Sequence, residues 1–199
     1  MKELAPKLFI FDMGGVVSRN TNVFLPVAEH LGLVAERLRE LASEPFSRLI
    51  TGRISVTEFW EIFSKRSGLE IREDLLARFF QPRQDQDVVE LVRRLHRKAP
   101  RVVVGTNTVE PHYRIHLDQG DYEPFDAVYA SHLMGLAKPD PAFYDYILRR
   151  EGCSAHEAFF TDDLPENVQA AAALGIRAFH FSGAAALKKQ IEELLRAGS

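Results

Sequence analysis

The chain has 199 residues, of which 46% are hydrophobic and 27% are charged, and its formal net charge is -3 at pH 7. A chain of this length and composition can bury a full core, which excludes a disordered or fibrous protein. Lysine and arginine are scattered among aspartate and glutamate, so there is no basic stripe for a phosphate backbone, and we expect no nucleic-acid partner.

No apolar run in the sequence has the length and flanks of a secretory signal or a membrane span. We therefore expect a cytoplasmic protein with no membrane partner. Cys153 is the only cysteine, which excludes an intramolecular disulfide and a cysteine-ligated metal cluster. The sequence carries no signal of oligomeric state.

Five short apolar runs predict buried strands, and four helical patterns lie between or after them. The predicted strands are residues 8–11, 101–105, 126–130, 158–161 and 177–181, and the predicted helices are residues 87–98, 110–119, 141–151 and 165–174. This alternation predicts an α/β fold with a Rossmann-like parallel sheet flanked by helices. Ligands of such sheets bind at the carboxyl ends of the strands.

Residues 18–86 break the alternation, because they show helical periodicity without an apolar run of strand type. We predict that this segment is a small α-helical cap inserted into the core, so that residues 1–17 and 87–199 form the catalytic core. Ser55 and Glu58 have the spacing of a capping box and predict a helix start inside the cap.

Asp12 is the first candidate catalytic residue, because it ends the first predicted strand and is followed by Met13, Gly14 and Gly15. A carboxylate in this place can attack phosphorus to form an aspartyl phosphate, and glycines let backbone N–H groups approach phosphoryl oxygens. We expect Met13 and Gly14 to line the substrate site. Taken alone, an aspartate after a strand is more often a turn or helix-cap residue.

Polar residues after two later strands make the signal more specific. Thr106 and Asn107 follow the second predicted strand and offer a hydroxyl and an amide to a phosphoryl oxygen. Lys138 follows the third strand and offers a cation for the charge that builds in the transition state. We therefore assign Asp12, Thr106 and Lys138 to catalysis, and Thr106 and Asn107 to substrate binding. The alternative for each residue alone is a turn, a surface lysine or a helix cap.

Asp162 and Asp163 end the fourth predicted strand, and adjacent carboxylates repel each other unless a positive charge lies between them. Mg²⁺ supplies such a charge and prefers oxygen ligands. We expect Asp12, Asp162 and the Gly14 carbonyl to bind the metal, with Asp163 and Asn167 orienting its waters from outside. Asp163 can also cap the helix that follows.

Four stretches in this order resemble the motifs of the haloacid dehalogenase (HAD) superfamily, and residues 18–86 stand where the family's helical cap belongs. The stretches are FIFDMGGVV at 9–17, VGTN at 104–107, GLAKP at 135–139 and FTDD at 160–163. Within the family, the chain is most similar to bacterial α-D-glucose 1-phosphate phosphatases. The resemblance implies a Mg²⁺-dependent phosphatase that hydrolyses a small phosphorylated metabolite, such as a sugar phosphate, through an aspartyl phosphate.

Gly14 departs from the family's pattern, in which phosphatases carry at this position a second aspartate that protonates the leaving group. A general acid of this kind contributes roughly a hundredfold to ten-thousandfold in rate. Either the enzyme is a slow phosphatase, or the substrate has a good leaving group, or another group replaces the acid. Asp163, Arg19 and a residue of the cap are the candidates.

Two alternatives stay open. Dehalogenases of the family also lack the second aspartate and use the nucleophile on carbon, but they need no Mg²⁺ and carry an aromatic residue in place of Gly14. A phosphate-binding protein that has lost turnover is the other alternative, although Asp12, Lys138 and the other motif residues are intact. His112 and His116 share a helix face but have no third ligand at suitable spacing, so we assign them no chemistry.

Overall fold

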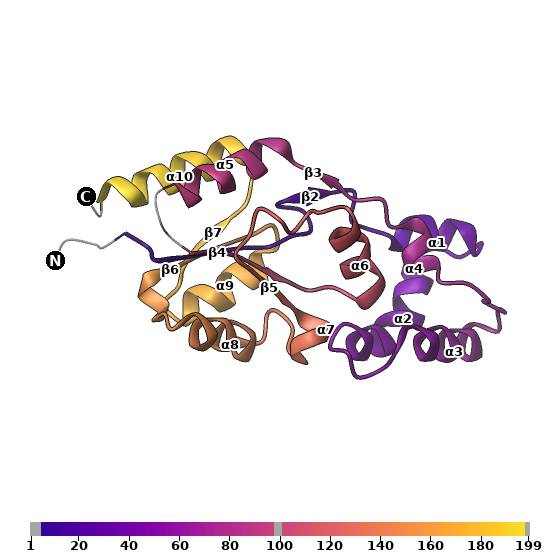
Figure 1. The fold of residues 1–199 in the computed structure, drawn as a ribbon. Helices are drawn as coiled ribbons and strands as arrows, with labels where there is room; N and C mark the ends of the chain where they lie inside the picture. The colour runs from indigo at the N-terminus through magenta and orange to yellow at the C-terminus, as the bar shows by residue number, and fades with distance from the viewer. Residues whose placement is uncertain (1–4, 98–100, 198–199) are drawn as a thin grey trace.

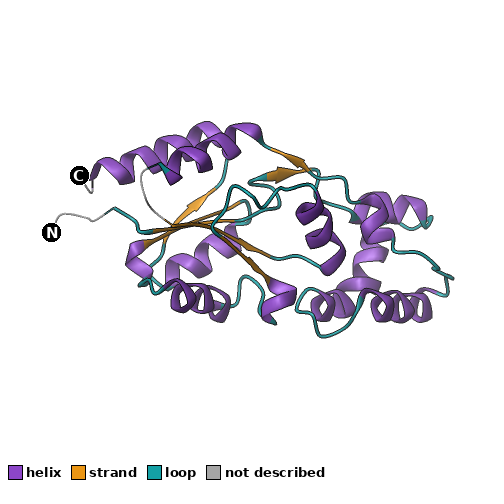
Figure 2. Cartoon of the chain, in the orientation of Figure 1, coloured by secondary structure: helices purple, strands orange, loops and turns teal. Residues whose placement is uncertain are grey.

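The structure is a computed structural model that describes residues 5–97 and 101–197 (Figures 1 and 2). A parallel five-stranded sheet lies at its centre, in the order β5-β4-β1-β6-β7. The strands are β1 (Leu8–Phe11), β4 (Arg101–Thr106), β5 (Ala127–Ala130), β6 (Ala158–Asp162) and β7 (Arg177–His180). Each predicted strand is present, and no end differs by more than one residue. The predicted α/β fold is confirmed.

Helices cover both faces of this sheet (Figure 1). They are α5 (Gln86–His96), α6 (Glu110–Asp118) and α10 (Ala184–Ala197) on one face, and α8 (Pro141–Glu151) and α9 (Pro165–Ala173) on the other. Along β1, Phe9 and Phe11 pack in the core beneath α5 and α10, whereas Leu8 and Ile10 pack in the core beneath α8. Because both faces of β1 are buried, every side chain of the strand is apolar.

Two helices of the core are additions to the predicted elements. The first, α7 (Ser131–Met134), is too short to produce a period in the sequence. The second, α10, is long and packs against the sheet through Leu187 and Ile191. The predicted helix 87–98 corresponds to α5, and its last residue, Lys98, lies outside the described residues. Within the described ranges, none of the helices has the length and apolar composition needed to cross a bilayer.

Residues between β1 and α5 form a separate group of helices at one end of the molecule (Figure 1). These are α1 (Phe24–His30), α2 (Ala35–Leu49), α3 (Val56–Ser67) and α4 (Leu75–Phe79), and they pack around their own buried cluster, which includes Phe59 and Phe63. Ser55 begins α3 with the predicted capping box, in which its hydroxyl accepts a hydrogen bond from the Glu58 backbone N–H.

A short antiparallel ribbon joins this helical group to the sheet. It consists of β2 (Ser18–Arg19) and β3 (Arg83–Gln84), which the sequence did not predict because two residues are too few for a strand pattern. The Arg19 guanidinium donates to Asp85 Oδ2 at 3.0 Å through Nε, and the Asp85 carboxylate caps the start of α5. The ribbon therefore holds the two ends of the helical segment side by side.

Candidate active site

Three carboxylates meet at the carboxyl ends of two neighbouring strands, β1 and β6. One oxygen each from Asp12, Asp162 and Asp163 lies within 4.8 Å of the other two, and no other group of three potential metal ligands occurs among the residues that the structure describes. Asp12 and Asp162 are buried. The side chains that the sequence assigns to a metal are thus brought together from positions 150 residues apart in the chain.

The ammonium group of Lys138 lies between two of these carboxylates. Its Nζ is 2.7 Å from Asp12 Oδ1 and 2.6 Å from Asp162 Oδ2, and the lysine side chain is 1% exposed. Burial lowers the pKa of Lys138, but the charges and hydrogen bonds of the two carboxylates outweigh burial, and the net shift of this pKa is upward. Lys138 is therefore charged, and it offsets part of the repulsion within the acidic cluster.

Lys138 reaches this position by a route that the sequence did not indicate, because α7 intervenes between β5 and the lysine. The side-chain amide of Asn107, directly after β4, holds the Lys138 backbone with two hydrogen bonds. Asn107 Oδ1 accepts from the Lys138 N–H at 2.8 Å, and Asn107 Nδ2 donates to the Lys138 carbonyl at 2.8 Å. The Lys138–Pro139 peptide bond is cis. The amide that we expected to face a phosphoryl oxygen is thus engaged with the lysine loop, and its contact with substrate stays a prediction.

Asp162 is fixed on its other side by hydrogen bonds to Oδ1. This oxygen accepts from the Leu164 backbone N–H and from Asn167 Nδ2, both at 2.9 Å. The Asn167 carbonyl in turn accepts from the Tyr144 hydroxyl at 2.8 Å. The alternative in which Asp163 caps α9 is wrong, because Leu164 is the N-cap residue and that cap has no side-chain hydrogen bond.

The surroundings of Asp12 disfavour the ionised form of its carboxyl group. Burial raises the pKa of Asp12 to about 7, and the nearby charges of Asp162 and Asp163 act in the same direction, although Lys138 opposes them. Asp12 Oδ1 bonds to Lys138, whereas Asp12 Oδ2 has no hydrogen-bond partner within the described ranges. A divalent cation in this cluster would favour the ionised carboxylate, so the donor set fits a hard metal ion.

The loop after β1 leaves polar groups free beside Asp12. The Met13 carbonyl accepts hydrogen bonds from the Val17 and Ser18 N–H groups, but the neighbouring Gly14 carbonyl bonds to none of the described residues. Thr106, at the end of the adjacent β4, is buried, and its hydroxyl has no partner in the described part of the chain. These groups are available for the metal and phosphoryl contacts that the sequence predicts.

A cavity of about 300 Å³ begins at these loops and extends between them and the helices α1 and α2. Met13, Gly14, Thr106 and Asn107 border it on the sheet side. We call it the cap-side cavity. Its size lies at the lower end of the range for small-molecule sites.

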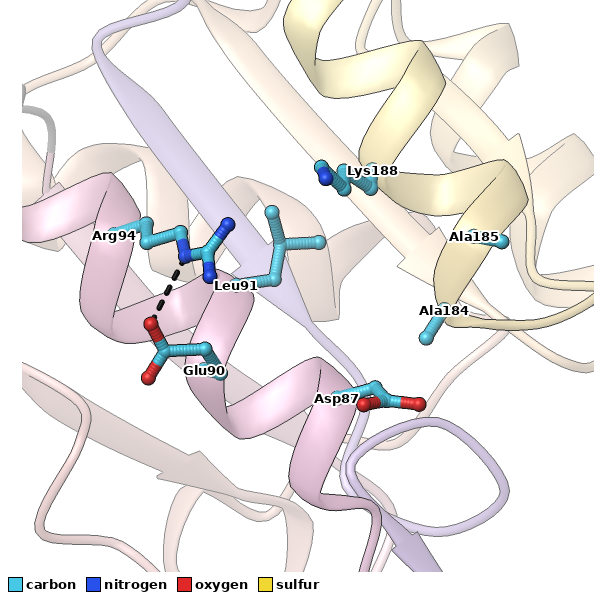
Figure 3. A pocket seen from close by; sticks show the side chains of 7 residues that line it. All are labelled: Asp87, Glu90, Leu91, Arg94, Ala184, Ala185 and Lys188. Carbon is cyan, nitrogen blue, oxygen red and sulfur yellow. Dashed lines mark hydrogen bonds and ion pairs between the residues drawn. The ribbon is translucent and has the colours of Figure 1, made fainter.

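Another hollow, of about 260 Å³, lies between α5 and α10 (Figure 3). None of the loops that follow β1, β4 and β6 borders it, and its dashed contact joins Glu90 and Arg94, whose side chains are about half exposed. An exposed pair at this helical spacing is a common surface feature. This hollow is therefore not the candidate active site.

The structure also places the residues considered as substitutes for the missing acid. Arg19 is paired with Asp85 in the linking ribbon, whereas Asp163 is part of the acidic cluster. A residue without a sequence signature, Thr21, lies closest to the missing side chain: a Cβ atom at Gly14 would be 3.3 Å from Thr21 Oγ1. A threonine in a loop has no periodicity or motif by which the sequence could reveal it.

The second glycine of the loop, Gly15, is required by the acidic cluster. Its φ is +80°, and a Cβ atom there would be 2.2 Å from Asp163 Oδ2. We expect Gly15→Ala to lower the free energy of unfolding by more than the roughly 1–2 kcal/mol that the left-handed backbone alone costs. Gly135→Ala is the matched control in urea unfolding, because Gly135 has φ +73° and open space around its Cβ position. Equal losses for the two variants would contradict the close approach of Asp163.

Comparisons with known proteins agree with this geometry. A family model described as haloacid dehalogenase-like hydrolase matches residues 6–175. The sesquiterpene phosphatase astK of Aspergillus oryzae is 29% identical over 194 residues, covering 95% of this chain and 96% of the relative. A protein from Porphyromonas gingivalis, described as a predicted HAD-like family hydrolase, has a TM-score of 0.79 at 24% identity, covering 96% of this chain and 98% of that one. A HAD family enzyme from Bacteroides thetaiotaomicron, in complex with magnesium and inorganic phosphate, has a TM-score of 0.71 at 22% identity, covering 88% and 93%. Because the family model spans most of the sequence, this chain belongs to the haloacid dehalogenase-like hydrolases.

Proposed function

We propose that the chain is a magnesium-dependent phosphatase in which Asp12 is the nucleophile. The observation that carries this proposal is the acidic cluster of Asp12, Asp162 and Asp163, with Lys138 between two of its members. In the structurally similar Bacteroides enzyme, the same fold holds magnesium and inorganic phosphate. Asp12, Asp162 and the Gly14 carbonyl would hold the ion, which when bound supplies positive charge beside the phosphoryl oxygens.

In the first step, the free Oδ2 of Asp12 attacks phosphorus, a new O–P bond forms, and the bond from phosphorus to the leaving alcohol breaks. Thr106 donates its hydroxyl hydrogen to a phosphoryl oxygen, and Lys138 balances the charge of the transition state and holds Asp12 in place. Asn167 holds Asp162 from its outer side, and Asp163 and Asn167 would orient the waters of the ion. We propose that residues 18–86 form the cap that covers this reaction, and that residues 1–17 and 87–199 form the core.

In the second step, water attacks phosphorus, the bond to Asp12 breaks, and inorganic phosphate leaves with the carboxylate restored. Gly14 supplies no carboxyl group for the proton that the alcohol takes up in the first step, so this proton comes from water in the cap-side cavity. Thr21 borders that cavity beside Gly14, where its hydroxyl can orient this water. The hydroxide that remains is neutralised by the proton that the attacking water releases in the second step. The enzyme therefore favours substrates whose leaving group needs little protonation.

Observations other than the shape of the cavity support two substrate classes. The likeness of the motif residues to glucose 1-phosphate phosphatases favours a sugar phosphate, whereas the Aspergillus relative is named for activity on a sesquiterpene. Both are small phosphorylated metabolites, which is the partner we propose.

Replacing the nucleophile tests the proposed function directly. We expect Asp12→Asn to abolish phosphate release from acetyl phosphate and phenyl phosphate, because a carboxamide cannot form the acyl phosphate. Asp145→Asn, an exposed aspartate paired with Arg149 on α8, is the matched control and keeps wild-type activity. EDTA should stop release by the wild type. Activity that survives EDTA, or halide release from haloacids without phosphate release, would instead support the dehalogenase alternative.

Metal binding should depend on pH through Asp12. Its pKa is raised to about 7 without an ion, so protons and Mg²⁺ compete for the carboxylate below this value. Isothermal titration calorimetry should give a Mg²⁺ dissociation constant about tenfold larger at about pH 6 than at about pH 8. In Asp12→Asn the affinity should be weaker and nearly independent of pH. The same affinity for the wild type at both pH values would count against Asp12 as a ligand.

A substitution at Gly14 can restore the aspartate that phosphatases of the family carry at this position. We expect Gly14→Asp to raise kcat on alkyl phosphates, which are poor leaving groups, by roughly tenfold or more, and to change acetyl phosphate turnover little. The new side chain must displace Thr21, so Gly14→Asn, with the same shape and no acidic proton, is the control. Equal effects of Asp and Asn would show that the gain or loss comes from packing and not from proton transfer.

A further inference from the structure

The cap-side cavity lies where the leaving group of the proposed reaction must go. In phosphoryl transfer, the attacking and leaving oxygens are roughly in line with phosphorus. Asp12 attacks from the end of β1, so the leaving oxygen points away from the sheet. The cavity begins at Gly14 and Thr106 and continues toward α1 and α2, in that same direction. The chemistry of the cavity walls therefore indicates which kind of alcohol the substrate carries.

Apolar side chains make up the wall that faces the sheet loops. Phe24, Phe46 and Ile50 border the cavity and are only partly buried, so each has apolar surface left to cover. The rings of Phe24 and Phe46 meet edge to face at 5.1 Å, and Phe80 adds a further aromatic surface. Covering such surface with an apolar ligand is favourable, in proportion to the area removed from water.

No charged partner is present for a second anionic group. Among the described residues that border the cavity there is no lysine, arginine, aspartate or glutamate, and its two titratable residues are histidines. His112 stacks on Phe80 at 3.8 Å, and burial lowers the pKa of His112 to about 4. Burial also lowers the pKa of His116, although Asp121 opposes this shift. Both histidines are neutral at neutral pH, so a second phosphate or a carboxylate would be buried without a counter-charge.

Most polar groups of the wall already have partners inside the protein. The Asn107 amide holds the Lys138 backbone, and Asn22 Oδ1 accepts from the Phe24 N–H at 3.0 Å. The Thr108 hydroxyl donates to the Val109 carbonyl at 3.4 Å. The several hydroxyls of a sugar would therefore find few free donors and acceptors, and a buried hydroxyl without a partner costs free energy.

We propose that the alcohol part of the substrate is an uncharged apolar chain or ring that lies against Phe24, Phe46 and Ile50, which makes the substrate a hydrophobic phosphate monoester. This proposal rests on the proposed phosphatase function and selects among the substrate classes that it allows. A sugar phosphate, a bisphosphate or a nucleotide is correspondingly a poor substrate.

A chain-length series tests the proposal. We expect kcat/KM with Mg²⁺ to rise about threefold to fourfold per methylene from methyl through butyl to hexyl phosphate, until the cavity is filled. Glucose 6-phosphate, whose leaving group is a primary alcohol like hexanol, should lie at least about tenfold below hexyl phosphate on the same measure. All alkyl phosphates are used below the concentrations at which they form micelles.

A pair of isoleucine variants links the effect to the cavity. Ile50 and Ile71 are both partly buried and pack on the same buried cluster of the helices between β1 and α5. Only Ile50 borders the cap-side cavity. We expect Ile50→Asp to lower the ratio of hexyl to methyl kcat/KM by about tenfold or more, because a charge then faces the chain. Ile71→Asp should leave this ratio unchanged, which controls for the loss of stability.

The outcomes separate the two proposals. If neither acetyl, phenyl nor any alkyl phosphate releases phosphate, the phosphatase function fails, and the substrate class fails with it. If phosphate is released but kcat/KM is flat along the series, or glucose 6-phosphate is preferred over hexyl phosphate, the apolar substrate class is wrong and the phosphatase function stands. Equal ratios in Ile50→Asp and wild type would likewise overturn the placement of the chain against Ile50.

Discussion

Repulsion among three carboxylates is the constraint on which the rest of this molecule depends. Asp12, Asp162 and Asp163 occupy one small volume at the carboxyl ends of β1 and β6, and much of that volume is removed from water. One ammonium group, that of Lys138, offsets only part of the negative charge. Burial, together with the remaining excess of negative charge, raises the pKa of Asp12, and the cluster has the donor set that suits a divalent cation.

Much of the surrounding structure can be understood as holding these groups in place. Asn107 fixes the Lys138 backbone, whereas Asn167 and the start of α9 fix Asp162. Gly15 leaves the space that Asp163 occupies. Each of these groups acts on the position of a charged side chain, as outer groups commonly do around a metal site.

The helical segment between β1 and α5 contributes in a different way, through surface rather than charge. Phe24, Phe46 and Ile50 bring apolar walls to a cavity whose floor is made by the polar loops of the sheet. Polar and apolar ends of a single cavity match a ligand that is charged at one end only. Thr21 stands at the junction, beside the glycine that replaces the family's second acid.

The sequence by itself determined the sheet, because strands buried on both faces appear as continuous apolar runs. It also indicated the acidic and basic residues of the site, because the carboxyl ends of parallel strands share one edge. It did not reveal the β2–β3 ribbon or α7, which are too short to produce a pattern. The Asn107 contact with Lys138, the position of Thr21 and the apolar cavity wall were decided only by tertiary structure. Each joins residues from separate elements, and no local propensity or spacing records which distant side chains will meet.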